Sequence, residues 1–213
     1  MSSLLLAALV TISASAGAAA EEAKTIIGFG DSLMAGYGLN QTDSFTVRLE
    51  AKLKSEGLDV HVINAGVSGD TTTGGKSRLA WTIDGQSKKP DLVILELGAN
   101  DSLRGIEPSL TRENLDWMLA QLKQRGVPVL LAGMMAPPNM GRDYGTEFNT
   151  IYPDLAKKYG VAFYPFFLDG VAADPSLNQG DGMHPNPEGV KIIVGKIAPY
   201  VMRALEGQGP SAP

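Results

Sequence analysis

The sequence predicts an α/β protein, a three-layer α/β/α sandwich around a five-stranded parallel sheet. Short β-rich runs alternate along the chain with segments whose apolar residues recur at helical spacing. A strand, a helix and a second parallel strand form one unit, and repeating this unit covers both faces of a sheet with helices. The chain of 213 residues has room for one such domain and too little for two ordinary ones.

Five β-rich runs are the expected strands, and four apolar stripes mark helices between or after them. The strands are expected at residues 25–29, 60–63, 92–95, 127–131 and 161–164. The stripes consist of Phe45, Leu49 and Leu53; of Leu115, Met118, Leu119 and Leu122; of Phe148, Ile151, Tyr152, Leu155 and Tyr159; and of Val190, Ile193, Val194, Ile197 and Val201. Pro153 must kink or begin the third of these helices, because proline has no amide hydrogen to donate.

Three of the helices should end at a glycine that leads into the next strand. Gly57, Gly126 and Gly160 stand at these junctions, and glycine adopts the left-handed conformation of a helix C-cap at little cost. The alternation of helix and strand therefore continues without a domain break over residues 24–206.

Composition excludes several classes of function. The chain has 18 Lys and Arg against 23 Asp and Glu, a net charge of −5, whereas binding to nucleic acid needs clustered positive charge. It has no cysteine, which excludes disulfides, thiolate metal sites and a cysteine nucleophile. Two histidines, His61 and His184, are too few for a His-rich metal site. We therefore expect neither of these metal sites and no nucleic-acid partner.

The first 20 residues are typical of a signal peptide. Residues 4–12 are apolar but too few to span a bilayer, and small residues follow up to Ala20, where we expect cleavage. The alternatives are a disordered Ala-rich tail and a lipid-anchored leader, for which the chain lacks a cysteine. We expect a bacterial protein exported to the periplasm or secreted, without stable membrane insertion. Its domain at 24–206 is followed by a disordered tail at 207–213.

Polar, glycine-rich loops follow three of the expected strands, where open α/β sheets bind their ligands. Ser32 follows the first strand, and a serine hydroxyl becomes a good nucleophile when a base takes its proton. His184, in a loop before the last helix, is the candidate base, and Asp181 can hold its other ring nitrogen. The backbone N–H groups of Ser32 and Gly69 and the side-chain amide of Asn100 could stabilise an oxyanion.

These residues also have plainer interpretations. Ser32 could merely cap the helix that follows it. Asp31 is expected to be a structural hydrogen-bond acceptor, and His61, inside a strand, a structural histidine. Asn100 could be a turn residue, Gly69 could be needed only for the backbone conformation, and Asp181 could cap the turn before Pro185. Asp70 and Asp101 are expected to stabilise local turns. Residues 69–77 resemble a phosphate-binding loop of a nucleotide-hydrolysing enzyme, but five residues separate Gly69 from Gly75 where that motif has four.

The four polar loops together resemble the SGNH hydrolase superfamily. Gly30-Asp31-Ser32-Leu33 matches its GDSL signature, and Ser32, Gly69, Asn100 and His184 occupy the four positions that give the superfamily its name. Within it the chain looks most like the acyl-CoA thioesterase I, lysophospholipase L1 and bacterial arylesterase group. The matching stretches are residues 30–37, 68–71, 98–105, 151–153 and 181–186.

The resemblance implies a flavodoxin-like fold and a Ser-His-Asp esterase or thioesterase that needs no metal or cofactor. Its substrate would be a small-molecule or lipid acyl ester, and we expect a monomeric or weakly associating chain. In such relatives a mobile loop after the fourth strand influences acyl-chain preference. Here that loop would span about residues 134–145, with a substrate-binding wall formed by Met134, Met135, Pro137, Pro138 and Met140.

Two other functions remain open on the same fold. A carbohydrate O-acetyl esterase would hydrolyse only acetyl groups in a polar site, and the apolar residues at 134–140 argue against it. A catalytically silent lipid- or glycan-binding module is the second, and the intact set Ser32, Asn100, Asp181 and His184 argues against that.

Overall fold

The computed structural model describes residues 22–207. The signal peptide expected at residues 1–20 lies outside the described residues, as does the expected tail beyond Gly207. No helix within residues 22–207 combines the length and the apolar character needed to cross a membrane.

Five parallel strands form one sheet in the order β2-β1-β3-β4-β5. The expected fold class is confirmed, and this is the strand order of flavodoxin-like proteins. The chain runs from β1 outwards to β2, and then back past β1 to β3. The sheet therefore has its topological switch point between β1 and β3, where open α/β sheets place their ligands. The strands are β1 (Lys24–Gly30), β2 (Val60–Gly66), β3 (Leu92–Glu96), β4 (Val129–Ala132) and β5 (Ala162–Tyr164).

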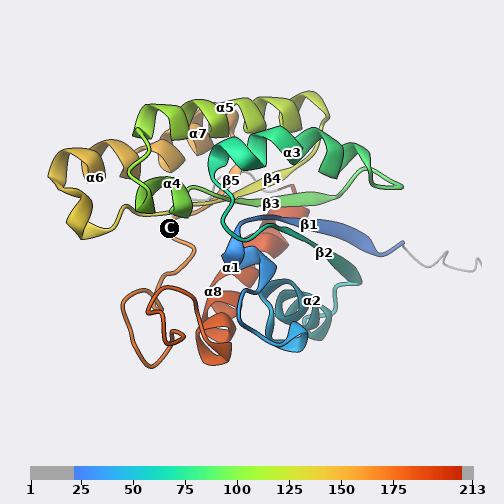
Figure 1. Cartoon of the computed structure of the whole chain (residues 1–213). Coiled ribbons are helices and arrows are strands. Elements are labelled where there is room, and N and C mark those ends of the chain that lie inside the picture. The colour runs from blue at the N-terminus through green and yellow to red at the C-terminus, as the bar shows by residue number, and fades with distance from the viewer. Residues whose placement is uncertain (1–21, 208–213) are drawn as a thin grey trace, which may run out of the picture.

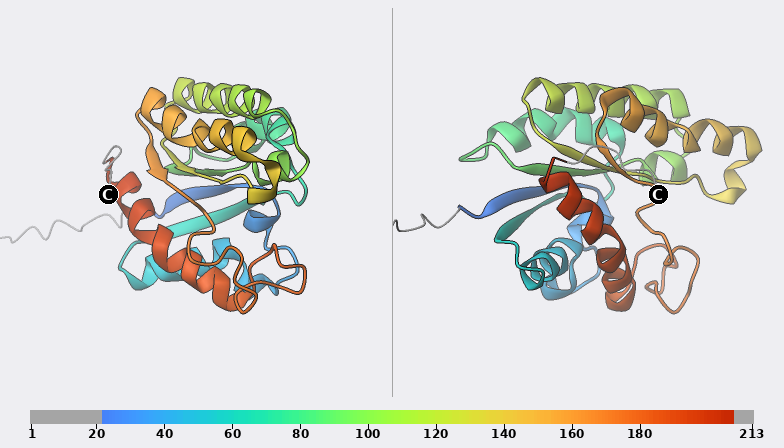
Figure 2. Two further views of the ribbon diagram at one scale, coloured as in Figure 1. Left: turned by 90° about the vertical axis from the view of Figure 1, so that its left-hand side faces the viewer. Right: turned by 180° about the vertical axis from the view of Figure 1, so that it is seen from behind.

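Helices cover both faces of the sheet (Figures 1 and 2). One face carries α1 (Ser32–Ala35), α2 (Phe45–Ser55) and α8 (Pro187–Leu205), and the other carries α3 (Thr72–Asp84), α4 (Ala99–Leu103), α5 (Pro108–Gln124), α6 (Arg142–Asn149) and α7 (Ile151–Tyr159). Two short 3₁₀ helices, η1 (Gln41–Asp43) and η2 (Pro138–Met140), lie in connecting segments. The three layers agree with the prediction.

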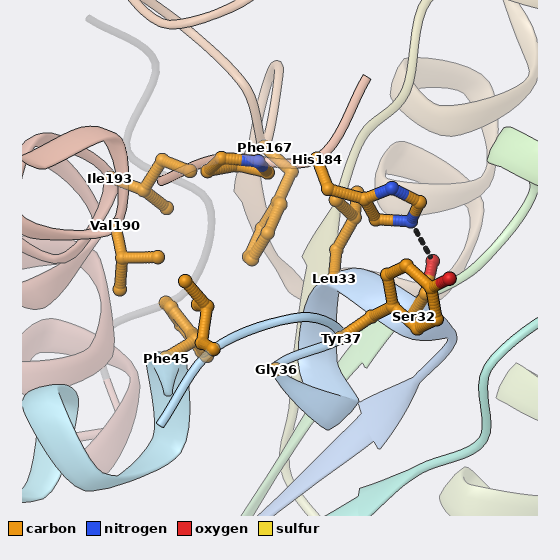
Figure 3. A pocket seen from close by; sticks show the side chains of 11 residues that line it. Ser32, Leu33, Gly36, Tyr37, Phe45, Phe167, His184, Val190 and Ile193 are labelled. Carbon is orange, nitrogen blue, oxygen red and sulfur yellow. Dashed lines mark hydrogen bonds between the residues drawn. The ribbon is translucent and has the colours of Figure 1, made fainter. Parts of the chain in front are cut away.

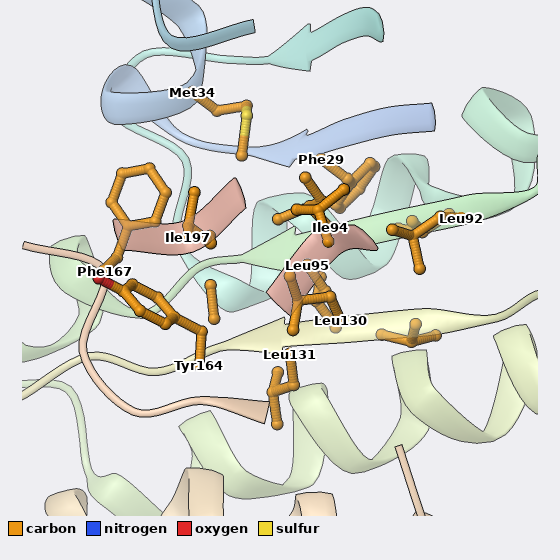
Figure 4. Close-up of a cluster of buried hydrophobic side chains, with 14 of the residues drawn as sticks. Phe29, Met34, Leu92, Ile94, Leu95, Leu130, Leu131, Tyr164, Phe167 and Ile197 are labelled. Atoms are coloured by element: carbon orange, nitrogen blue, oxygen red, sulfur yellow. The ribbon is translucent and has the colours of Figure 1, made fainter. Parts of the chain in front are cut away.

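The core lies on both sides of the sheet, and the middle strands are buried throughout. All five residues of β3 are buried, as expected for a parallel strand with helices over both faces. Figure 4 shows Leu92, Ile94 and Leu95 of this strand among the packed side chains of its neighbours. The stripes predicted for α2, α5, α7 and α8 are buried except Tyr159, which is partly buried. Such a continuous core holds the loops at the ends of the strands in fixed positions.

The helix ends also follow the sequence. Gly57, Gly126 and Gly160 have positive φ angles of 87°, 63° and 64°, as left-handed C-caps require. Pro153 begins a helix and does not kink one, because it lies in the first turn of α7. The apolar stripe that was predicted as a single helix from Phe148 to Tyr159 is divided at Thr150, so Phe148 lies in α6 and the rest of the stripe in α7.

One helix has no counterpart among the predicted stripes. The buried face of α3 consists mainly of small and polar residues, Thr72, Gly75 and Thr82 among them, which carry little hydrophobic periodicity. A Cβ on Gly75 would lie 2.2 Å from a methyl carbon of Leu97, so the helix packs very close to the sheet. The segment that resembles a phosphate-binding loop is thus the start of a closely packed helix.

Candidate active site

Ser32 is the first residue of α1, directly beyond the carboxyl end of β1. Asp31 is the N-cap of this helix, and its Oδ1 accepts a hydrogen bond from the Leu33 amide at 3.0 Å. The interpretation of Ser32 as a cap is therefore wrong, and its hydroxyl is left for another partner. Asp31 acts as the structural acceptor that the sequence predicts.

His184 and Asp181 complete a hydrogen-bonded chain that begins at Ser32. Nε2 of His184 lies 2.8 Å from Oγ of Ser32, and Nδ1 lies 2.7 Å from Oδ2 of Asp181. Figure 3 shows the His184 ring pointing at the serine hydroxyl. Ser32 and His184 are 152 residues apart in the sequence, so only the fold brings them together. The arrangement is that of a nucleophile, a base and a carboxylate that orients the base.

The turn before His184 is stabilised by Asp181. Its Oδ1 accepts hydrogen bonds from the backbone amides of Met183 and His184, at 2.9 and 3.0 Å. These two amides, together with the His184 side chain, lower the pKa of Asp181 to about 2. The carboxylate is therefore ionised at neutral pH and suited to stabilise an imidazolium on His184.

A second set of contacts holds the His184 loop against α1. Nε2 of Gln179 donates to the carbonyl oxygens of Tyr37 and Pro185, at 2.8 and 3.0 Å. The Tyr37 ring also packs on the imidazole, with ring centroids 4.7 Å apart. Gln179 thus holds the backbone of the His184 loop, and Tyr37 packs on the His184 ring.

Behind His184 lies a narrow apolar cavity between α1, α2 and α8 (Figure 3). Leu33, Phe45, Phe167, Val190 and Ile193 contribute to its walls. Its volume of about 10 Å³ is close to the minimum that one water molecule needs. The cavity as it stands therefore has no room for an acyl chain.

Asn100 and Gly69 lie on the loops that face Ser32 across the switch point. Nδ2 of Asn100 lies 3.0 Å from Oδ2 of Asp31 and 3.0 Å from the carbonyl oxygen of Asp70. The amide nitrogen is therefore placed between the loop that carries Ser32 and the loop that carries Gly69. Gly69 has a φ of +84°, and Nη2 of Arg104 donates to its carbonyl oxygen at 2.8 Å. The structure thus brings the predicted donors to one place.

Two buried carboxyl groups lie beneath this place. Asp31 and Glu96 are both fully buried, and the Asp31 amide points at Oε2 of Glu96 at 3.4 Å. Burial is the main cause that raises the pKa of Asp31 to about 6. Burial, followed by the nearby charge of Asp31, raises the pKa of Glu96 well above its usual value. Oε1 of Glu96 has no hydrogen-bond partner within residues 22–207.

Sequence reasoning did not find the residues that fix the Asn100 loop from behind. Asp101, expected to stabilise only its own turn, accepts from the Thr72 amide at 2.8 Å and from the Thr111 hydroxyl at 3.1 Å. It therefore joins α4 to α3 and α5. Tyr152 is buried in α7 and donates to the Leu97 carbonyl oxygen at 2.8 Å. A tyrosine within an apolar stripe was the available signal, because a buried hydroxyl needs a partner.

The expected substrate-binding loop differs from its prediction. Met134, two residues after the end of β4, is only 3% exposed and belongs to the buried hydrophobic core. The prediction that it lines a substrate wall is therefore wrong. Met135 is 52% exposed, and Pro137 precedes η2, which contains Pro138 and Met140. The segment also contains the beginning of α6, so it is partly helical.

The second histidine, His61, is not part of the chain of contacts from Asp181 to Ser32. His61 lies on the outer strand β2 with its side chain 65% exposed, and its Nδ1 lies 3.1 Å from Glu50. It makes no contact with Ser32, in agreement with its predicted structural role. In the described part of the chain, no three His, Asp or Glu side chains gather closely enough to hold a metal ion.

Comparison with known proteins gives a consistent result. The model of the GDSL-like lipase/acylhydrolase family matches residues 29–192. The chain is 39% identical to an arylesterase of Vibrio mimicus over 188 residues, 88% of this chain and 93% of the relative. It is 37% identical to thioesterase 1/protease 1/lysophospholipase L1 of Escherichia coli K12 over 179 residues, 84% of each chain. The crystal structure of AlinE4, an SGNH-hydrolase family esterase, is similar with a TM-score of 0.75 and 48% identity, covering 88% of this chain and 99% of that one.

Proposed function

The chain belongs to the GDSL-like lipase/acylhydrolase family, and from this premise we propose that it is a serine hydrolase of carboxylic esters and thioesters. The observation that carries the proposal is the unbroken chain of contacts from Asp181 through His184 to Ser32, at 2.7 and 2.8 Å. The names of the arylesterase and thioesterase relatives support the two classes of substrate.

In the first half of the reaction Ser32 forms an acyl-enzyme. Nε2 of His184 takes the hydroxyl proton while Oγ attacks the acyl carbonyl carbon. His184 then gives this proton to the departing alcohol or thiol as the bond to the leaving group breaks. Asp181 holds Nδ1 and stabilises the imidazolium between the two proton transfers.

In the second half water hydrolyses the acyl-enzyme. His184 takes a proton from water, the resulting oxygen attacks the acyl carbon, and the proton returns to Ser32 as the acid leaves. In both halves the carbonyl oxygen becomes an oxyanion. We assign its stabilisation to the Ser32 and Gly69 N–H groups and to the side chain of Asn100, whose Nδ2 contacts Asp31 and Asp70, the residues next to Ser32 and Gly69.

The test is hydrolysis of p-nitrophenyl esters from acetate to palmitate by the unaltered chain and by Ser32→Ala. Removing the nucleophile should lower kcat by at least about 10³-fold. Ser55→Ala is the matched control, because its hydroxyl bonds only the Lys52 carbonyl at the exposed end of α2. Unchanged hydrolysis by Ser32→Ala would refute the proposal.

The chain-length profile of the same experiment separates the related functions. Activity on long acyl chains would support the substrate-binding role expected for Met135 and Met140. Activity restricted to acetate would favour the carbohydrate O-acetyl esterase. Absence of hydrolysis of every ester by the unaltered chain would favour the binding module.

We also propose that the chain is exported and acts as a monomer. The apolar run at residues 4–12 and the small residues before Ala20 support export. The triad is completed within one chain, so catalysis needs no second copy. Periplasmic or secreted protein should begin at Glu21, which N-terminal sequencing reads directly, and sedimentation should give one chain per particle.

A further inference from the structure

From the contacts of Asn100 we infer that Asp31 is a positioning residue, whose carboxylate holds the Asn100 amide with Nδ2 turned towards the Ser32 and Gly69 loops. The inference rests on the proposed esterase function, because it concerns the donor to the oxyanion. It gives a purpose to a buried carboxyl group that the Ser-His-Asp mechanism does not use.

The two ends of an asparagine amide have nearly the same shape, so its partners decide which end points inward. Nδ2 of Asn100 has two acceptors, Oδ2 of Asp31 and the carbonyl oxygen of Asp70, each at 3.0 Å. A carboxylate and a carbonyl oxygen can only accept hydrogen bonds. If Asn100 turned over, its Oδ1 would face two acceptors, so the nitrogen-inward orientation is enforced.

The two acceptors, Asp31 and the Asp70 carbonyl oxygen, have different roles when an oxyanion forms. In the free protein both amide hydrogens of Asn100 have hydrogen-bond partners. One of them must therefore be shared with the oxyanion, or must leave its partner and bond the oxyanion instead. The bond to Asp70 is between neutral groups, whereas the bond to the Asp31 carboxylate is charge-assisted and stronger. The hydrogen bond to Asp31 is therefore kept, and the amide hydrogen of Asn100 that bonds the Asp70 carbonyl oxygen is the one donated to the oxyanion.

Asp31 itself has almost no freedom to move. Its Oδ1 is occupied by the Leu33 amide at 3.0 Å, and its own amide points at Glu96. The side chain is fully buried, and a Cβ on the preceding Gly30 would lie 2.4 Å from Oε2 of Glu96. A side chain that is enclosed in this way holds its partner, Asn100, in one orientation.

The charge on Asp31 is unfavourable for the fold, and this also points to a functional role. Burial raises the pKa of Asp31 to about 6, so the ionised form is costly in this place. An N-cap alone does not require a buried charge, because serine or asparagine caps a helix equally well. Perturbed groups of this kind cluster at functional sites.

The test is Asp31→Asn, assayed alone and combined with Asn100→Ala. Asparagine at this position still caps α1 through its Oδ1, but it turns an NH₂ group towards Nδ2 of Asn100. Two donors then face each other, and only the Asp70 carbonyl oxygen still favours the original orientation, so the Asn100 amide is no longer held in one orientation. We expect kcat and kcat/KM to fall together by about 10²-fold, the effect of losing one oxyanion donor, with KM within about twofold.

The double variant gives the decisive readout. If Asp31 acts through Asn100, Asp31→Asn should cause no further loss in the Asn100→Ala background, since the donor is already absent. Phenylboronic acid, which forms a tetrahedral adduct with a nucleophilic serine, should bind both single variants and the double variant with similarly weakened affinity. Multiplied losses in the double variant, or a fully active Asp31→Asn, would overturn the inference.

Controls separate this role from folding and from the proposed function. Asp91→Asn is the matched variant, because Asp91 accepts from the Thr25 amide at the opposite end of the sheet and should leave kcat unchanged. If Asp31→Asn does not fold, Asp31→Ser still caps α1 without reaching Asn100 and should show the same lack of additivity. A failure of the esterase proposal would appear in Ser32→Ala, whose activity is measured independently of these variants.

Discussion

Two carboxylates serve the site from opposite sides, and their environments differ in almost every respect. Asp181 lies in a surface loop with its side chain 33% exposed, whereas Asp31 is fully buried at the end of β1. Two backbone amides and His184 lower the pKa of Asp181 to about 2. Burial raises the pKa of Asp31 to about 6. The same side chain is thus stabilised as an anion in one place and destabilised in the other.

The difference shows how two roles are built from one residue type. Asp181 needs a firm negative charge next to an imidazole, and hydrogen bonds from its own loop supply the stabilisation. Asp31 needs a fixed position next to an amide, and the packed end of the sheet supplies this at the cost of burying a charge. Each environment predicts a different response to replacing the carboxylate by an amide.

Asp181→Asn should have the largest effect. The introduced asparagine can still accept from the Met183 and His184 amides through its Oδ1, so the turn should survive. Its NH₂ group would face Nδ1 of His184 and favour the wrong tautomer. We expect kcat to fall by about 10³- to 10⁴-fold, with a thermal midpoint close to that of the unaltered chain.

The result is read from kcat with p-nitrophenyl acetate, with circular dichroism as the control for folding. A fall of less than tenfold would mean that His184 does not need the Asp181 carboxylate to act as the base. The contrast with Asp31 would then lose its mechanistic basis.

The same contrast explains how far the sequence predicts the site. Asp181 and His184 are three residues apart, and their contacts arise within one turn, so local reasoning finds them. The partners of Asp31 are 65 and 69 residues away, on β3 and α4. A carboxyl group next to a serine gives no sign in the sequence that it will be buried above a second acid, so Glu96 was not anticipated.

The fold was predictable for a related reason. Periodic apolar stripes and helix-ending glycines are local signals, and they identified the sheet and four of its helices. The helix α3 escaped because close packing against the sheet selects small residues such as Gly75, which leave no apolar stripe. Met134 was misplaced because sequence position alone does not say where a strand stops contributing to the core. Prediction fails where packing between distant segments decides the outcome.

The stability of Asp31→Asn, relative to the unaltered chain, should depend on the pH. Above pH 5 the relative stability of Asp181→Asn should depend on the pH much less. The folded-state pKa of Asp31 is raised from 3.8 to about 6, so its contribution to stability is present below pH 4 and lost as the pH rises through 6. Asparagine does not titrate. The free energy of unfolding of Asp31→Asn, relative to the unaltered chain, should therefore increase by about 3 kcal/mol between about pH 3.5 and pH 7.5.

Urea unfolding at a series of pH values measures this difference, and the subtraction cancels the carboxylates common to both proteins. The relative gain should level off above about pH 7, where Asp31 is ionised in both the folded and unfolded states. A gain that is independent of pH would mean that Asp31 is not destabilised by burial. Greater stability combined with lower activity is the expected pattern for a residue kept for function.

Glu96→Gln separates the two buried acids by the pH range over which the stability changes. Burial and the charge of Asp31 raise the pKa of Glu96 well above its usual value, so the folded protein holds it protonated and neutral. The unfolded chain ionises it above about pH 4, and folding must then return a proton. Relative to the unaltered chain, the folding equilibrium constant of Glu96→Gln should rise with pH by up to about tenfold for each pH unit, until the carboxyl group ionises in the folded protein as well. A curve that levels off with that of Asp31→Asn would show that Glu96 is already ionised near neutral pH. The pair would then carry two charges beneath the oxyanion donor, and the anchoring of Asn100 would have to overcome a much stronger repulsion of the oxyanion.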